Sequence, residues 1–264
     1  MRQTPWQLLR IPALLLYLIL VGCLSKPEAT PIQPSTPTHD RSPTRVLFIG
    51  NSFTFWKGGL WKHINALSAA MEPPLKYQAE SVTRGGASLE VMWHRTKAQS
   101  VIAEGRWDVV VLQGDIPETT VDSFKQYSRR FVDAVRKVGA RPILFMAWDY
   151  DRLSWLSMNE IATAHGAMSK ELDVEVAPVG LAWKESARRR PTLDMYGRDR
   201  EHPSAAGMYL SLLTIEGVIS NADPTTRLPH ELGIRGLEKT HASDKEHLRK
   251  VAAWAIKKWA SRRP

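Results

Sequence analysis

The sequence predicts an α/β fold, a three-layer α/β/α sandwich built on a doubly wound parallel sheet of about five strands. Short apolar runs such as VLFIG and VVVLQG have the length and composition of strands that are buried on both faces. Segments with helical periodicity separate these runs, so strands and helices alternate. The length of 264 residues, 43% of them hydrophobic, suits one such domain with added segments at its ends.

Five segments are expected to form the strands, and four helices are expected to connect them. The strands cover residues 44–50, 76–82, 108–114, 142–148 and 174–180. The helices cover about 60–71, 88–103, 119–138 and 157–172. In the third helix the apolar residues fall largely on one stripe, which indicates packing against the sheet. The stripe comprises Val121, Phe124, Phe131, Val132, Val135 and Val138.

Two further helices are expected near the C-terminus. The first spans about 203–220 and closes a core domain of residues 44–221. An extension of residues 222–264 follows, with an amphipathic helix at about 243–261. One side of that helix carries Leu248, Val251, Ala252, Ile256 and Trp259. A helix of this kind packs on the domain edge or contacts a membrane, and docking is favoured because it is the commoner arrangement at a domain end.

Residues 1–22 have the features of a signal peptide. Arg2 and Arg10 precede the apolar run IPALLLYLILVG, which is shorter than the ~20 residues that span a bilayer. The run ends in LVGC, which resembles the lipobox of bacterial lipoproteins and contains the only cysteine, Cys23. The resemblance implies cleavage before Cys23, its acylation, and a lipid anchor in the cell envelope. The alternative is a plain signal anchor with an incidental cysteine.

Residue Leu24, rather than an aspartate, follows the cysteine. In Gram-negative lipoproteins this pattern resembles outer-membrane sorting, with the protein facing the periplasm. Residues 23–43 then form a tether, with prolines at positions 27, 31, 34, 37 and 43 among Ser and Thr residues. Such a segment favours extended geometry over core packing.

The chain is basic, with a formal net charge of +9. Removal of residues 1–22 takes away two arginines and no acid, which leaves +7. A basic protein can bind nucleic acid, but an exported lipoprotein meets little of it. A solvated basic surface is therefore the favoured interpretation, and nucleic acid is not an expected partner.

Chemically useful residues follow the predicted strands, where open α/β sheets place their sites. A hydroxyl follows the first strand in Gly50-Asn51-Ser52, and glycines follow the second in Arg84-Gly85-Gly86-Ala87. Gln113, Gly114 and Asp115 end the third strand, and the later segment GRDREHPSAAG carries Asp199 and His202. Together these residues could supply the nucleophile, the oxyanion donors, the base and the base-orienting acid of acyl transfer.

Across about 44–220, the chain resembles the SGNH (GDSL-type) hydrolases, a superfamily of esterases, lipases and carbohydrate deacetylases. GNSFT resembles their first block, with Ser52 as nucleophile. Gly85 or Gly86 matches the glycine of the second block, and DREHPSAAG resembles the last block, with Asp199 three residues before His202. The resemblance implies a Ser52-His202-Asp199 triad and a flavodoxin-like sandwich.

The third block departs from the family pattern. It is usually Gly-x-Asn, whereas this chain has LQGD. Gln113 can donate the same kind of amide hydrogen bond from a longer stem. The expected oxyanion hole therefore combines the amides of Ser52 and Gly86 with the side chain of Gln113.

No cofactor or metal is expected, because no pair of histidines has ligand spacing. His63, His94 and His165 are expected to be surface or packing residues. Trp93, Trp148 and Trp155 could line a sugar pocket or fill the core.

The leading functional hypothesis is a serine esterase of the cell envelope that acts on an acylated or O-acetylated glycan or a smaller ester. One alternative is an acyltransferase with the same triad. The other is a glycan-binding module without catalysis.

Overall fold

Five parallel strands form the sheet of the computed structural model, which describes residues 43–70, 76–227, 237 and 240–261. The order across the sheet is β2-β1-β3-β4-β5. The strands are β1 (Thr44–Gly50), β2 (Tyr77–Thr83), β3 (Val109–Gly114), β4 (Arg141–Met146) and β5 (Glu175–Ala177). The predicted signal peptide (1–22) and all but the last residue of the predicted tether (23–43) lie outside the described residues.

Strand β1 lies inside the sheet and shows why the apolar runs are continuous. It pairs with β2 on one side and with β3 on the other. Val46 and Phe48 point into one core, whereas Leu47 and Ile49 point into a second core on the opposite face. Both faces of the strand are therefore buried, as expected for a parallel sheet between two helical layers.

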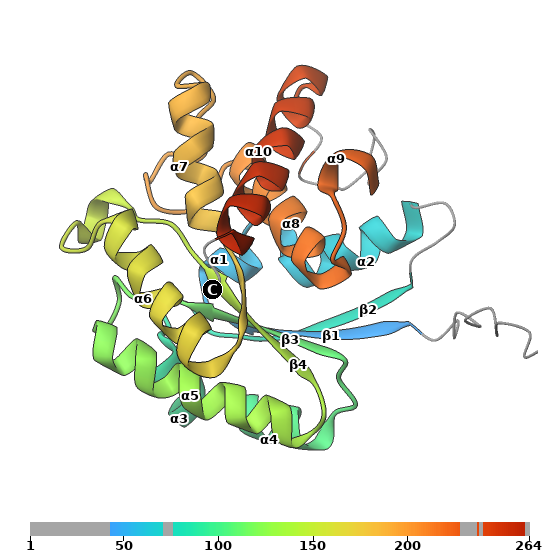
Figure 1. The fold of residues 1–264 in the computed structure, drawn as a ribbon, viewed down its shortest axis with the longest axis vertical. Helices are drawn as coiled ribbons and strands as arrows, with labels where there is room; N and C mark the ends of the chain where they lie inside the picture. The colour runs from blue at the N-terminus through green and yellow to red at the C-terminus, as the bar shows by residue number, and fades with distance from the viewer. Residues whose placement is uncertain (1–42, 71–75, 228–236, 238–239, 262–264) are drawn as a thin grey trace, which may run out of the picture. The chain divides into compact units, whose positions relative to one another are not determined.

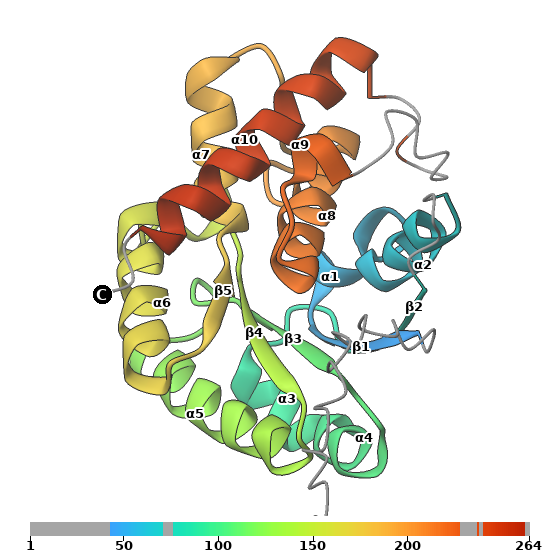
Figure 2. The same cartoon turned by 45° about the vertical axis from the view of Figure 1, so that its right-hand side comes forward.

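Helices cover both faces of the sheet (Figures 1 and 2). The first core contains residues of α1 (Ser52–Phe55), α2 (Leu60–Ala70), α7 (Val179–Arg189), α8 (Ala205–Ser220) and α10 (Ala242–Ala260). The second contains residues of α3 (Leu89–Arg95), α4 (Ala98–Glu104), α5 (Val121–Lys137) and α6 (Met158–Leu172). The short elements are η1 (Trp56–Gly58), η2 (Asp151–Leu153) and α9 (Pro224–Arg227). The predicted three-layer α/β/α sandwich is confirmed.

Two predicted elements were wrong in detail. The helix expected at 88–103 is two helices, because Thr96 turns the chain between α3 and α4: its hydroxyl bonds the carbonyl of Met92 and the amide of Ala98. The strand expected at 174–180 ends at Ala177, and Pro178 precedes the unexpected helix α7. The apolar run VEVAPVG had obscured this change of structure.

The C-terminal helix docks on the domain. Figure 2 shows α10 lying across α7 and α8. Its buried residues include Leu248, Val251, Ala252, Ala255 and Trp259, and most of these belong to the first core. The expectation that this helix docks on the domain is therefore confirmed. The residues that the structure describes belong to one compact unit.

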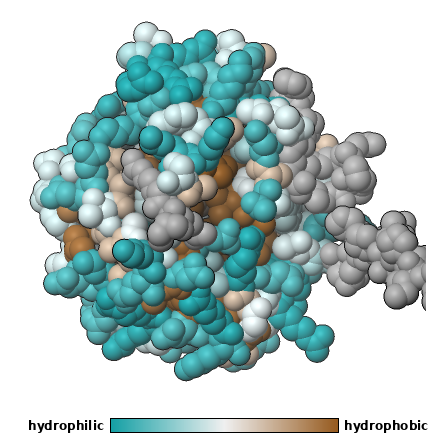
Figure 3. Space-filling view, viewed as in Figure 1, coloured by the Kyte–Doolittle hydropathy of each residue, from teal (hydrophilic) through white to brown (hydrophobic). Residues whose placement is uncertain are grey.

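The described surface is mostly hydrophilic on the face in Figure 3, although apolar residues gather in the middle of that view. Trp155 stands out as an exposed large apolar side chain, with 52% of its surface accessible. Within the described ranges, no helix combines the length and apolar character needed to cross a bilayer.

The chain order creates a switch point in the sheet. From β1 the chain moves outward to β2, then crosses to β3 on the other side of β1. Connections on the two sides diverge at the carboxyl ends of β1 and β3, which leaves a crevice there in open α/β sheets. Ser52 follows β1 and Asp115 follows β3 at this edge.

Candidate active site

Ser52 is the first residue of α1, directly after β1. Asn51 caps the helix, because its side-chain oxygen accepts a hydrogen bond from the amide of Phe53 at 3.0 Å. The amide of Ser52 therefore occupies a helix N-terminus, where an N–H has no partner within its own helix. We call residues 50–54 the Ser52 turn.

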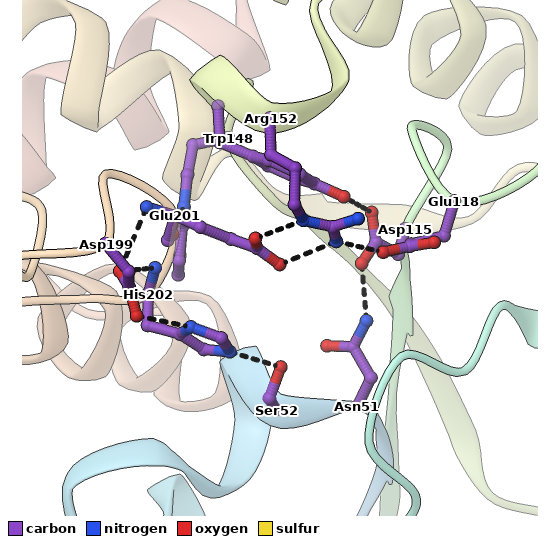
Figure 4. A network of polar contacts seen from close by, with 10 residues as sticks. Asn51, Ser52, Asp115, Glu118, Trp148, Arg152, Asp199, Glu201 and His202 are labelled. Atoms are coloured by element: carbon purple, nitrogen blue, oxygen red, sulfur yellow. Dashed lines mark hydrogen bonds and ion pairs between the residues drawn. The ribbon is translucent and has the colours of Figure 1, made fainter.

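Asp199 and His202 lie on an irregular loop before α8. We call residues 197–203 the His202 loop. The Nδ1 atom of His202 lies 3.0 Å from Oδ2 of Asp199, and its Nε2 atom lies 2.8 Å from Oγ of Ser52. Figure 4 shows this continuous series of polar contacts. The structure thus brings together the three residues that the sequence nominated as a triad.

The loop favours the ionised form of Asp199. Burial acts to raise the pKa of Asp199, but hydrogen bonds from the amides of His202 and Glu201, together with the His202 ring, outweigh it and lower the pKa. The two amide bonds measure 2.9 and 3.1 Å. A carboxylate in this position can orient the imidazole and stabilise its cation.

Aromatic rings hold the imidazole of His202 from two sides. The ring of Trp56 stacks on it with centroids 3.9 Å apart and an angle of 19°. Phe53 meets it edge-on at 5.8 Å. Both residues follow Ser52 closely in the sequence, so the segment that positions the hydroxyl also restrains the imidazole.

The expected donation of Gln113 to an oxyanion stays a prediction, and in the structure its side chain has a supporting role. Its side chain is 0% exposed and lies beneath the Ser52 turn. Its Oε1 accepts hydrogen bonds from the amide of Asn51 at 2.7 Å and from the hydroxyl of Thr54 at 3.1 Å. Its Nε2 is also buried and has no hydrogen-bond partner among the described residues. Through Oε1, Gln113 supports the turn.

Gly50 gives the Gln113 side chain its space. A Cβ atom at Gly50 would lie 2.6 Å from Oε1 of Gln113 and 2.5 Å from Oγ1 of Thr54. Any side chain there would displace the two groups that hold the turn. This close approach explains why the strand ends on a glycine directly before Asn51 and Ser52.

The predicted second-block glycines lie beside the Ser52 turn. The amide of Arg84 donates to the carbonyl of Gly50 at 3.1 Å, which ties the turn after β2 to the end of β1. A Cβ at Gly85 would be 4.0 Å from the ring of Phe55. Gly86 has a φ of +61° and is exposed, a conformation that glycine adopts without strain. The oxyanion role of the Gly86 amide stays a prediction.

Asp115 bonds the side chain of Asn51, whereas Gln113 bonds its backbone amide. Its carboxyl group is buried and accepts hydrogen bonds from Nδ2 of Asn51 at 2.5 Å and from the hydroxyl of Tyr150 at 3.3 Å. Burial is the main cause that raises the pKa of Asp115 from 3.8 to about 7, and the nearby acids Glu118 and Glu201 raise it further. Asp115 and Gln113 therefore hold Asn51 from two sides.

An arginine joins two acids across the site, as Figure 4 shows. Arg152 donates from Nε and Nη2 to the two carboxylate oxygens of Glu201, at 2.6 and 2.9 Å. Its Nη2 also bonds Glu118. Glu201 directly precedes His202, and Glu118 follows β3, so this arginine spans two separate parts of the sheet edge.

Trp148 belongs to the core rather than to a sugar pocket. Its side chain is fully buried and stacks on Trp183 with centroids 3.6 Å apart. Its Nε1 donates to the carbonyl of Glu201 at 2.9 Å. The ring therefore supports the His202 loop from within.

The three histidines that were expected to be packing or surface residues are so in the structure. His63 and His165 are buried, and His94 is exposed and hydrogen bonded to Tyr127 at 2.8 Å. Across the described ranges, no group of three or more His, Cys, Asp or Glu side chains is arranged to hold a metal ion.

Several residues of the site escaped the sequence analysis. Trp56, Tyr150 and Arg152 carry no motif of their own, and Glu201 stands in the last block without a predicted role. Asp115 stood in the stretch LQGD that was noted for Gln113, and its contact with Asn51 is made across 64 residues of sequence. Its position after a buried strand had marked Asp115 as a candidate, but it did not reveal the contact with Asn51.

Comparisons with known proteins complete the description. No protein-family model matches the sequence, and no curated protein matches it. Among solved structures, a protein from Slackia heliotrinireducens assigned to the SGNH hydrolases is 24% identical, with a TM-score of 0.56 over 67% of this chain and 100% of the other. A DUF4886 family protein from Bacteroides uniformis is 18% identical, with a TM-score of 0.61 over 82% and 95% of the two chains.

An acetylxylan esterase from Geobacillus stearothermophilus is also similar in structure. It is 18% identical, with a TM-score of 0.54 over 66% of this chain and 93% of the other. Each of these chains is matched over nearly its whole length. The protein therefore has the fold of the SGNH hydrolases.

Proposed function

We propose that this protein is a serine esterase that hydrolyses carboxylic ester bonds. One observation carries the proposal: Oγ of Ser52, the imidazole of His202 and the carboxylate of Asp199 are hydrogen bonded in series, at 2.8 and 3.0 Å. The series lies at the carboxyl edge of the sheet, where α/β folds place their sites. The structural likeness to SGNH hydrolases also supports the proposal of a serine esterase.

In the proposed reaction, Oγ of Ser52 attacks the ester carbonyl while Nε2 of His202 takes its proton. Asp199 accepts the Nδ1 proton in a hydrogen bond and stabilises the imidazolium. The tetrahedral intermediate expels the alcohol, which receives the proton from His202. Water then attacks the acyl-enzyme with His202 again acting as base, and Ser52 and the free acid are regenerated.

The negative oxygen of the intermediate needs donors that are already in place. The amide of Ser52 at the start of α1 is one such donor, and the amide of Gly86 in the adjacent turn is proposed as the second. Gln113 is not included in this proposed set, because its Oε1 is hydrogen bonded beneath the turn and its Nε2 is buried.

We propose an acylated glycan, with O-acetyl esters foremost, as the substrate class. The support is the structural likeness to an acetylxylan esterase. The sequence LVGC at Cys23 supports a location at the cell envelope through a lipid anchor, where such glycans occur.

The test uses the full-length protein in detergent. Initial rates are measured with p-nitrophenyl acetate, butyrate and octanoate, and release of acetate is measured from acetylated xylo-oligosaccharides. His202→Ala should lower kcat by roughly 10³-fold or more. The matched control His94→Ala replaces a histidine on the far helical layer and should keep the wild-type rate.

Two results would contradict the proposal. One is a wild-type protein that hydrolyses none of these esters. The other is a His202→Ala variant with the wild-type rate. Appearance of acetylated glycan acceptor in place of free acetate would identify the protein as an acyltransferase.

A further inference from the structure

The segment between β4 and α6 contacts the His202 loop at several points. Nε1 of Trp148 donates to the carbonyl of Glu201 at 2.9 Å. In the opposite direction, the hydroxyl of Tyr196, next to the loop, donates to the carbonyl of Asp149 at 2.6 Å. These bonds join the end of β4 to the loop that carries Asp199 and His202.

Two ion pairs extend this contact, and their polarities are opposite. Asp151 pairs with Arg200 at 3.5 Å, and the next residue, Arg152, pairs with Glu201 at 2.6 Å. An acid-base sequence on one segment thus faces a base-acid sequence on the other. A one-residue slip between the segments would place like charges together, so the pairs specify a single register.

The two ion pairs differ in strength. The side chains of Asp151 and Arg200 are 76% and 50% exposed, and exposed pairs contribute little. Glu201 is only 14% exposed, and Arg152 binds both of its carboxylate oxygens. Such two-point contacts are the stronger and more directional kind. Arg152 also bonds Glu118, which is 22% exposed.

The His202 loop depends on contacts of this kind. Its internal bonds, such as those from the amides of Glu201 and His202 to Asp199, fix the imidazole relative to Asp199. They do not fix the loop relative to Ser52, which belongs to a different part of the chain. Arg200 also has a φ of +58°, a conformation that is unfavourable for a residue other than glycine. External contacts to the segment after β4 can therefore help to hold the loop in place beside Ser52.

We propose that Arg152 is a positioning residue that locks the His202 loop to the ends of β3 and β4. Its contact with Glu201 sets the distance between Nε2 of His202 and Oγ of Ser52. Its contact with Glu118 connects the loop to the end of β3, where Gln113 and Asp115 hold Asn51. The inference rests on the proposed function, because the distance matters to the rate only if His202 acts on Ser52.

Kinetics of Arg152 variants test the proposal. Arg152→Ala should lower kcat for p-nitrophenyl acetate by about 10- to 100-fold, because a displacement of about 1 Å in a catalytic group can lower a rate about 10²-fold. KM should stay within about twofold, since Arg152 is not assigned to bind substrate. Arg152→Lys should restore little, because an ammonium cannot bind a carboxylate through a planar fork.

A matched control is present in the same chain. Arg129 makes the same two-point contact with Glu171 on the surface of α5 and α6, and its side chain is 44% exposed against 51% for Arg152. Arg129→Ala should leave kcat at the wild-type value. In addition, the reductions in kcat caused by Arg152→Ala and by Glu201→Gln should not multiply in the double variant, because both substitutions remove the same Arg152–Glu201 contact.

Amide hydrogen exchange provides a readout that does not depend on activity. Peptides covering residues 197–203 should exchange faster in Arg152→Ala than in the wild type or in Arg129→Ala. If the wild type hydrolyses no ester, the proposed function fails, but this measurement still tests the contact. Wild-type kcat and wild-type exchange in Arg152→Ala would overturn the inference, as would a raised KM with unchanged kcat, which would make Arg152 a substrate contact.

Discussion

Replacing Asp115 with asparagine should change how the stability of the protein depends on pH. The carboxyl group is buried at the end of β3, and burial is the main cause that raises its pKa from 3.8 to about 7. An asparagine can accept from Nδ2 of Asn51 and donate to the oxygen of Tyr150, as a protonated carboxyl does. Asp115→Asn therefore keeps the contacts of the neutral form and removes the ionisation.

The direction in which stability changes with pH follows from proton binding to Asp115. Between 3.8 and about 7 the folded wild type holds a proton on Asp115 that the unfolded chain has released. The stabilisation from this proton is fully present below pH 3.8 and is lost as pH rises through the folded pKa of about 7. The slope is about 1.4 kcal/mol per pH unit over a window about 3 units wide, which gives a change of about 4 kcal/mol.

Urea unfolding, followed by tryptophan fluorescence between pH 4.5 and 8.5, measures the effect. The difference in unfolding free energy between Asp115→Asn and the wild type removes contributions that both proteins share. That difference should rise in favour of the variant up to about pH 7 and then level off. Asp133→Asn, on the exposed side of α5, controls for loss of a carboxylate. A difference that is constant across the range would refute the reasoning.

Three further variants test separate parts of the structure. Gln113→Ala should lower the free energy of unfolding by about 3 kcal/mol, because it leaves the buried amide of Asn51 unpaired and opens a cavity. Wild-type stability with a reduced kcat would instead indicate that Gln113 donates to the oxyanion. Trp56→Ala should lower kcat by about tenfold in steady-state assays, because a ring stack contributes about 0.5–1.5 kcal/mol, and an unchanged kcat would show that the stack is dispensable. Cys23→Ser should abolish metabolic labelling with a palmitate analogue, and label that persists would exclude the lipid anchor at that residue.

The core of the fold could be predicted from the sequence because its signals are local. The stretches VLFI in β1 and VVVL in β3 are apolar at every position, which is typical of strands that are buried on both faces. Helix α7 was missed because it begins one residue after Pro178 within an apolar run. Its buried face is defined by contacts with α8 and α10, which local periodicity does not contain.

The same distinction applies to the candidate site. Ser52, Asp199 and His202 stand in short motifs, so their sequence neighbours identified them. Gln113 was predicted to be an oxyanion donor from its residue type, but its support of the Ser52 turn could not be predicted, because the direction of its side chain depends on the space above Gly50. Arg152 was missed because its partners lie 34 and 49 residues away. Contacts across such separations are set by the packing of the sheet and its loops.

Covalent labelling with a serine-directed fluorophosphonate tests the central claim most directly. The full-length protein is treated with the reagent, digested and analysed by mass spectrometry, beside the variants Ser52→Ala and His202→Ala. The account predicts one adduct on Ser52 in the wild type, none in Ser52→Ala and greatly slowed labelling in His202→Ala. No adduct on the wild type, or an adduct on another serine that persists in Ser52→Ala, would contradict it.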